Sequence, residues 1–206
     1  TQAGASFVVF GKASDFNAVV NLSNLDGNNG FRLDGATPYD RAGTSVSDAG
    51  DVNGDGFDDL IVGATYADGN GDGSGASYVV FGKASGFDAA MNLSGLDGSD
   101  GFRLDGVAEG DRSGLSVSTA GDVNDAGFDD VIVSAAFADP DDSGVLNFAG
   151  SGASYVVFGK ASGFDAAITL SSLNGSNGFR LDGVAEYDLS GKSVSTAGDV
   201  NGDGFD

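Results

Sequence analysis

The chain has 206 residues, of which 40% are hydrophobic, so it is long enough for one or two domains with a core. Its 31 acidic and 9 basic residues give a net charge of −22, which argues against nucleic-acid binding and favours cations. The sequence has no Cys and no His, which excludes catalytic pairs and zinc sites built on these residues. It also has no apolar stretch of about 18 residues, so no membrane insertion is predicted.

The predicted elements of one repeat are four strands. Residues 43–50 alternate small and apolar side chains and predict a first strand, and the apolar run 59–64 predicts a buried second strand. Residues 76–82, which are β-branched and aromatic, and residues 101–106, which alternate, predict the third and fourth strands. The intervening residues 84–100 predict a loop with at most one short turn or strand.

Three sequence markers recur with one spacing, first of 71 and then of 77 residues. They are Phe-Gly-Lys at 10–12, 81–83 and 158–160, Gly-Phe-Arg-Leu-Asp-Gly at 30–35, 101–106 and 178–183, and Asp-Val-Asn at 51–53, 122–124 and 199–201. The six extra residues fall between Ala135 and Gly152 and predict a longer surface loop. A four-stranded repeat of this length predicts an all-β fold of propeller blades. Arg32, Arg103 and Arg180 share one strand position and are expected to pair with nearby aspartates.

The loop between the first two strands carries oxygen side chains at alternating positions. Positions 1, 3, 5 and 9 are Asp51, Asn53, Asp55 and Asp59, and the carbonyl of Phe57 adds a backbone oxygen at position 7. Hard oxygen ligands at this spacing can wrap Ca²⁺, whereas Mg²⁺ demands tighter geometry. Position 12 is a valine in a strand rather than the glutamate of an EF-hand, so that motif is rejected. A hairpin turn alone would explain only one or two of these residues.

Two further copies of the loop depart from the first. The second keeps Asp122, Asn124 and Asp130, but position 5 is Ala126 and the acid has moved to Asp125, so calcium binding there stays open. The third keeps Asp199, Asn201, Asp203 and Phe205, and the sequence given stops before its position 9.

The predicted strands divide the chain into four parts. We predict a partial blade with third and fourth strands at 1–42, and a blade with a calcium loop at 43–113. A blade with a degenerate calcium loop follows at 114–190, and the start of a further blade at 191–206. About three blade-equivalents fall short of the roughly four to eight that close a propeller, so we expect further blades. An open three-blade solenoid is the alternative.

The order of these motifs resembles the FG-GAP repeat of integrin α-subunit N-terminal propellers, in its bacterial secreted form. Phe81 and Gly82 are the Phe-Gly element, and the loop Gly-Asp-Val-Asn-Gly-Asp-Gly-Phe-Asp-Asp-Leu-Ile-Val-Gly-Ala begins at Gly50. Thr65 follows Gly-Ala where the family has proline, and Ser134 departs further. The resemblance covers essentially the whole chain. It implies a seven-bladed propeller with calcium between the first two strands of a blade.

From this resemblance we expect a secreted or cell-surface module for adhesion or for recognition of a protein or glycan, with structural Ca²⁺ and no enzymatic activity. The expected partners are such a ligand and further blades, but not nucleic acid. An accessory propeller attached to a secreted, phospholipase-like hydrolase is the alternative. Catalysis by an acid pair such as Asp58 and Asp59 is disfavoured, because neighbours in a strand face opposite sides.

Overall fold

The computed structural model describes residues 3–139 and 150–206 and places only strands and single 3₁₀ turns in them, which confirms the all-β prediction. Part of the predicted long loop, residues 140–149, lies outside the described residues. The strands are β1 (Ala5–Val9), β2 (Gly30–Asp34), β3 (Ala42–Gly50), β4 (Asp59–Ala64), β5 (Ala76–Val80), β6 (Ala90–Asn92), β7 (Gly101–Asp105), β8 (Val117–Gly121), β9 (Asp130–Ala135), β10 (Ala153–Val157), β11 (Ala167–Thr169) and β12 (Gly178–Asp182). The 3₁₀ turns are η1 (Leu22–Asn24), η2 (Leu93–Gly95) and η3 (Leu170–Ser172).

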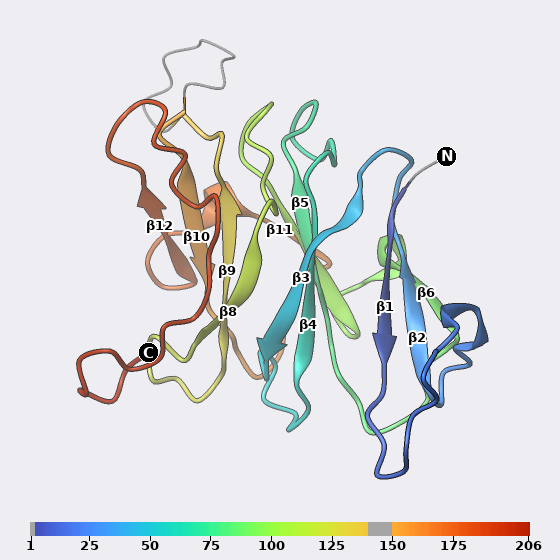
Figure 1. The fold of residues 1–206 in the computed structure, drawn as a ribbon. Helices are drawn as coiled ribbons and strands as arrows, with labels where there is room; N and C mark the ends of the chain where they lie inside the picture. Colours follow the sequence, from blue (N-terminus) through green and yellow to red (C-terminus); the bar gives the residue numbers. More distant parts are fainter. Residues whose placement is uncertain (1–2, 140–149) are drawn as a thin grey trace.

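The strands form three sheets that stand side by side (Figure 1). Their strand orders are β1-β2-β6, β11-β7-β5-β4-β3 and β12-β10-β9-β8. In the middle sheet, β3, β4, β5 and β7 are the four predicted strands of one repeat, and each pairs antiparallel with the next. Their ends differ from the predicted ends by two residues at most, and the arrangement is that of propeller-like blades.

The connection between the third and fourth strands is more structured than the sequence predicts. Residues 84–100 contain both the strand β6 and the turn η2, so the prediction of at most one short element was wrong. The strand β6 pairs in parallel with β2 of the preceding sheet, and β11 pairs in the same way with β7. Strands of three residues carry no readable period, and it is the neighbouring sheet that supplies their hydrogen-bond partners.

The core lies between neighbouring sheets rather than within one of them. All five residues of β5 and of β10 are buried. Phe87 stacks on Phe31 of the preceding sheet with ring centroids 4.5 Å apart and an interplanar angle of 6°, and Phe164 stacks on Phe102 with the same values. Each repeat therefore extends an aromatic side chain onto the sheet before it.

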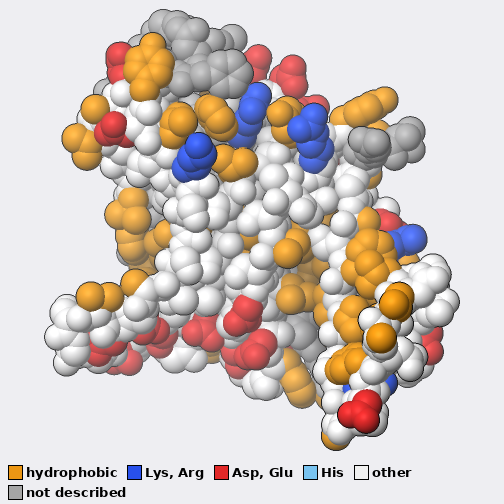
Figure 2. Space-filling model, viewed as in Figure 1, with side chains coloured by type: hydrophobic (Ala, Val, Ile, Leu, Met, Phe, Trp, Pro, Cys, Tyr) orange, Lys and Arg blue, Asp and Glu red, His pale blue; other side chains and the backbone are white. Residues whose placement is uncertain are grey.

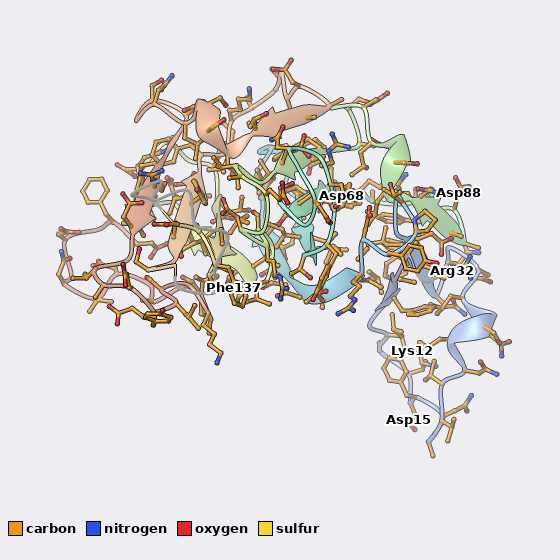
Figure 3. The ribbon with its side chains drawn as sticks, turned by 90° about the horizontal axis from the view of Figure 1, so that it is seen from above. Lys12, Asp15, Arg32, Asp68, Asp88 and Phe137 are labelled. Carbon is orange, nitrogen blue, oxygen red and sulfur yellow. The ribbon has the colours of Figure 1, made fainter. Side chains whose placement is uncertain are left out.

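Three arginines at one strand position pair with aspartates two residues later, as the sequence predicts. The distances are 2.8 Å from Arg32 to Asp34, 2.7 Å from Arg103 to Asp105 and 2.6 Å from Arg180 to Asp182. The pairs of Arg32 and Arg180 are exposed and contribute little to stability, about 1 kcal/mol or less, whereas Asp105 in the middle pair is buried. Figure 3 shows Arg32 on β2, and Lys12 and Asp15 in the segment that connects β1 with β2.

The turn before β8 contains a buried carboxylate, Asp111, whose Oδ2 accepts a hydrogen bond of 3.1 Å from the Ala108 N–H. Burial raises the pKa of Asp111 from 3.8 to about 6, the Ala108 N–H opposes this rise, and the negative charge of Asp139 adds to it. The folded state therefore binds this proton more tightly than the unfolded chain does. Its contribution to stability is fully present below about pH 4 and is lost as the pH rises through about 6.

Replacing Asp111 by asparagine should remove this pH dependence while keeping an oxygen that can accept the Ala108 N–H. We expect the variant to exceed the parent in unfolding free energy by about 1 kcal/mol at pH 8 and not at pH 4. Urea unfolding at both values measures the difference. Equal pH dependence in parent and variant would contradict the assignment.

Candidate metal centre

The first two candidate loops each begin at an irregularity in the first strand of their blade. The pairing of β3 with β4 shifts between Asp48 and Gly50, and the pairing of β8 with β9 shifts between Thr119 and Gly121. Gly50 has a φ of 68° and its N–H donates to Asp48 Oδ1 at 2.9 Å. A positive φ favours glycine, and a bulge of this kind bends the strand and redirects the chain. The bulge therefore turns the chain into the loop at residue 51.

In the first loop the side chains at positions 1, 3 and 5 converge. The Asp55 N–H donates to Asp51 Oδ1 at 3.0 Å and to Asn53 Oδ1 at 2.8 Å, so these two oxygens are neighbours. Asn53 Nδ2 donates to Asp55 Oδ2 at 3.0 Å. The N–H groups of Gly56 and Phe57 donate to Asp51 Oδ2 and Asp55 Oδ1. The loop thus closes around three of the predicted ligand side chains.

The third loop repeats this arrangement. Asp203 N–H donates to Asp199 Oδ1 at 3.1 Å and to Asn201 Oδ1 at 3.0 Å, and Gly204 N–H donates to Asp199 Oδ2 at 2.9 Å. Phe205 N–H donates to Asp203 Oδ1 at 3.1 Å. No strand is formed by the described residues 191–206, so this network of hydrogen bonds within the loop forms without strands on either side of it.

The second loop keeps the backbone but loses part of this network. Asp125 has a φ of 53° where the first loop has Gly54 at 73°. Asp122 still accepts the N–H groups of Ala126 and Gly127, at 2.9 and 2.7 Å. Position 5 offers no carboxylate, and Asn124 Oδ1 is buried without a hydrogen-bond partner among the described residues. A buried acceptor of this kind needs a partner such as water or an ion.

The acids at position 9 lie at the base of their loops and are fully buried. Asp59 Oδ2 accepts the Val52 N–H at 3.0 Å, and Oδ1 accepts the Gly82 N–H at 2.8 Å. Burial raises the pKa of Asp59 to about 7 against these hydrogen bonds, and the charges of Asp55 and Asp51 raise it further.

The second blade has the same arrangement beneath its loop. Asp130 accepts the N–H groups of Val123 and Gly159 at 3.1 and 2.9 Å, and burial raises its pKa to about 6. Sequence reasoning missed this role of the glycine after the third strand. The recurrence of Phe-Gly once per repeat is the signal that could have found it.

The structure thus brings Asp51, Asn53 and Asp55 together and sets Asp59 beneath them. Asp59 accepts two backbone hydrogen bonds, and a ligand role would use its remaining lone pairs. Within the described ranges, no three acidic side chains form a cluster that could hold a metal by themselves. A cation would therefore also need the Asn53 amide oxygen and the predicted carbonyl of Phe57, a residue that is 41% exposed. These are hard oxygen donors, which fit Ca²⁺.

The candidate loops lie at one end of the sheets. Figure 2 shows acidic side chains gathered along the lower edge, where Figure 1 places the loops after β3 and β8 and the C-terminal segment. Lys and Arg side chains lie on the upper part of the same face and at its right-hand edge, and further acidic side chains lie along the upper edge (Figure 2). The loop end of the molecule is therefore an acidic surface that attracts cations.

A comparison with protein families agrees with the sequence motifs. The model of the FG-GAP repeat matches residues 42–80, which run from the start of β3 to the end of β5 and include the first candidate loop. Such a repeat suggests a propeller module involved in recognition. Within the described residues, no helix has the length and hydrophobicity needed to cross a membrane. Residues 42–80 are thus an FG-GAP repeat, set in a fold of propeller-like blades.

Proposed function

We propose that the chain is a calcium-binding β-propeller module in which Ca²⁺ has a structural role. The observation that carries the proposal is the convergence of oxygen side chains in the first loop and its repetition in the third. Asp51, Asn53, Asp55 and the Phe57 carbonyl would hold the ion, and Asp59 would contribute from below. Bound Ca²⁺ would offset the repulsion among carboxylates that the folded loop holds close together.

The test is a calcium titration of thermal stability with Asp55→Ala beside the parent chain. At tenfold excess of Ca²⁺ over Kd, each occupied site should add about 1.4 kcal/mol to the free energy of unfolding. The variant should lose the contribution of the first loop. Asp88→Ala is the matched control, because Asp88 is an exposed acid outside the loops (Figure 3). No change in the melting temperature of the folded parent chain at millimolar Ca²⁺ would refute the proposal. Asp59→Ala is less informative, because Asp59 is fully buried and its truncation would also leave the N–H groups of Val52 and Gly82 at the base of the loop without their acceptor.

We further propose that the module serves in adhesion or in recognition of a protein or glycan outside the cell. Extracellular modules bind Ca²⁺ with Kd of about 10⁻⁴–10⁻³ M, so the calcium titration should cover this range. A net charge of −22 disfavours nucleic acid as a partner. It favours a partner with positive charges, or one whose oxygen groups can share a bound Ca²⁺ with the chain. Binding of the chain to arrays of glycans and to extracellular matrix proteins, with and without Ca²⁺, would test this role.

The same proposal assigns binding rather than catalysis to the chain. Asp58 is exposed, whereas the neighbouring Asp59 is buried with both oxygens accepting hydrogen bonds. Two acids in such different surroundings do not face one substrate, which argues against their acting as a catalytic pair.

We also propose that further blades pack against the sheet that contains β12. Phe179 and Leu181 are 36% and 48% exposed, whereas Phe102 and Leu104 at the same repeat positions are fully buried. The following blade would supply a stacking aromatic ring and a short parallel strand, as Phe164 and β11 do for the middle sheet. In a chain that is longer by one repeat, Phe179→Ala should cost as much stability as Phe102→Ala. A cost unchanged from the present chain would refute this packing.

A further inference from the structure

The first candidate loop is contacted by a carboxylate from the next blade. Asp129, at position 8 of the second loop, accepts the Asp51 N–H with Oδ2 at 2.7 Å. In return, the Asp129 N–H donates to the Asp51 carbonyl oxygen at 3.2 Å. Both backbone groups of the first predicted calcium ligand are therefore held by one residue 78 positions away in the sequence.

The next pair of loops repeats the contact. Asp206, at position 8 of the third loop, accepts the Asp122 N–H at 3.3 Å. The glycines before the two loops make room for these carboxylates: a side chain at Gly50 would overlap Asp129, and one at Gly121 would overlap Asp206. The hydrogen bond and the glycine that makes room for the carboxylate therefore recur together from one repeat to the next.

Two more contacts hold the first loop from the same side. The Lys160 N–H, which directly follows the Phe-Gly element of the next blade, donates to the Val52 carbonyl at 3.0 Å. The ring of Phe128 lies so close to Gly54 that a side chain at Gly54 would overlap it. The following blade thus fixes positions 1, 2 and 4 of the loop.

We propose that Asp129 is a positioning residue for the loop at 51–59, and Asp206 for the loop at 122–130, so that calcium binding and the packing of successive blades are coupled. The inference rests on the proposed calcium function and names the residue that links the calcium loop of one blade to the next blade. If bound Ca²⁺ needs Asp51 in this position, calcium binding strengthens the packing of the following blade against the loop. By thermodynamic linkage, that packing then raises the calcium affinity of the loop by the same factor.

Calcium titration of the ¹⁵N-labelled chain by NMR tests the proposal site by site. The amides of Gly54 and Gly56 report on the first loop, and those of Gly202 and Gly204 report on the third. In Asp129→Ala we expect the Kd of the first loop to rise about tenfold, as the loss of a hydrogen bond to a charged group implies. The Kd of the third loop should not change.

Two more variants separate positioning from charge. Asp129→Asn keeps an oxygen that can accept the Asp51 N–H and should restore most of the affinity. Asp58→Ala removes a carboxylate from the same position of the first loop, where Asp58 is exposed, and should weaken binding far less than Asp129→Ala. Equal affinity of parent and Asp129→Ala would overturn the coupling alone, and no response of Gly54 and Gly56 in the parent would overturn the calcium function as well.

Amide hydrogen exchange of the parent chain gives a second test that needs no variant. The amides of Asp51 and Lys160 both donate across the blade boundary. Saturating Ca²⁺ should slow their exchange by about tenfold if ion and docked blade stabilise one another. Exchange at these two amides that is unchanged by bound Ca²⁺ would overturn the coupling.

Discussion

Phe102→Ala is expected to lower the free energy of unfolding by about 4 kcal/mol, as large truncations of buried aromatic residues do. Phe102 is fully buried between two sheets, where it stacks on Phe164 at 4.5 Å and meets the edge of Phe81 at 5.9 Å. The substitution leaves a cavity at the boundary between blades. Urea unfolding followed by circular dichroism measures the loss.

Phe179→Ala is the matched control, since Phe179 stands at the same repeat position but is 36% exposed. We expect this variant to lose only about 1 kcal/mol, because less apolar surface is removed from the interior. The difference between the two losses measures what packing between sheets contributes. Equal losses would contradict the view that the core lies between the sheets.

Gly63→Ala is expected to destabilise the chain by about 3 kcal/mol through overpacking. Gly63 lies in β4, and a methyl group there would overlap the carbonyl oxygen of Gly114 in the adjoining repeat. That oxygen belongs to backbone whose N–H is bonded to the Ser134 carbonyl at 2.8 Å, so it cannot move cheaply. Thermal or urea unfolding gives the loss.

Gly95→Ala controls for the general effect of replacing glycine. No atom lies within 4 Å of a side chain built at Gly95, and its φ is not in the left-handed region. We expect a change within about 0.5 kcal/mol, with a small gain because the unfolded chain loses freedom. A comparable loss in both variants would show that close approach at Gly63 is not the cause.

The regular strands could be predicted from the sequence because their signals are local. The apolar run of β4 and the β-branched residues of β5 fix both strands to within two residues, and recurring markers give the repeat. The glycine-rich alternation of the first loop likewise predicts which side chains converge. Its conformation recurs in the third loop without flanking strands, so it is encoded in the loop itself.

Contacts across the blade boundaries could not be predicted, since they join residues far apart in sequence. Nothing local distinguishes Asp129, which bonds Asp51, from the exposed Asp58 at the same loop position. The sequence also does not reveal that position 63 requires glycine, because the next repeat has Ser134 at the equivalent position and the repeats therefore share no glycine there. The burial of Asp59 depends in the same way on Gly82, which reaches it only after β5 has paired with β4.

The parallel pairing of β6 with β2, and of β11 with β7, means that the repeat in the sequence and the unit that folds are offset. Excision of residues 43–113 as a single blade would remove β6 from the sheet that it completes and would leave β7 without β11. Such a fragment would present two open strand edges, which invite edge-to-edge aggregation. Stable sub-fragments should therefore be cut after a short parallel strand such as β11 rather than at the boundary of a repeat.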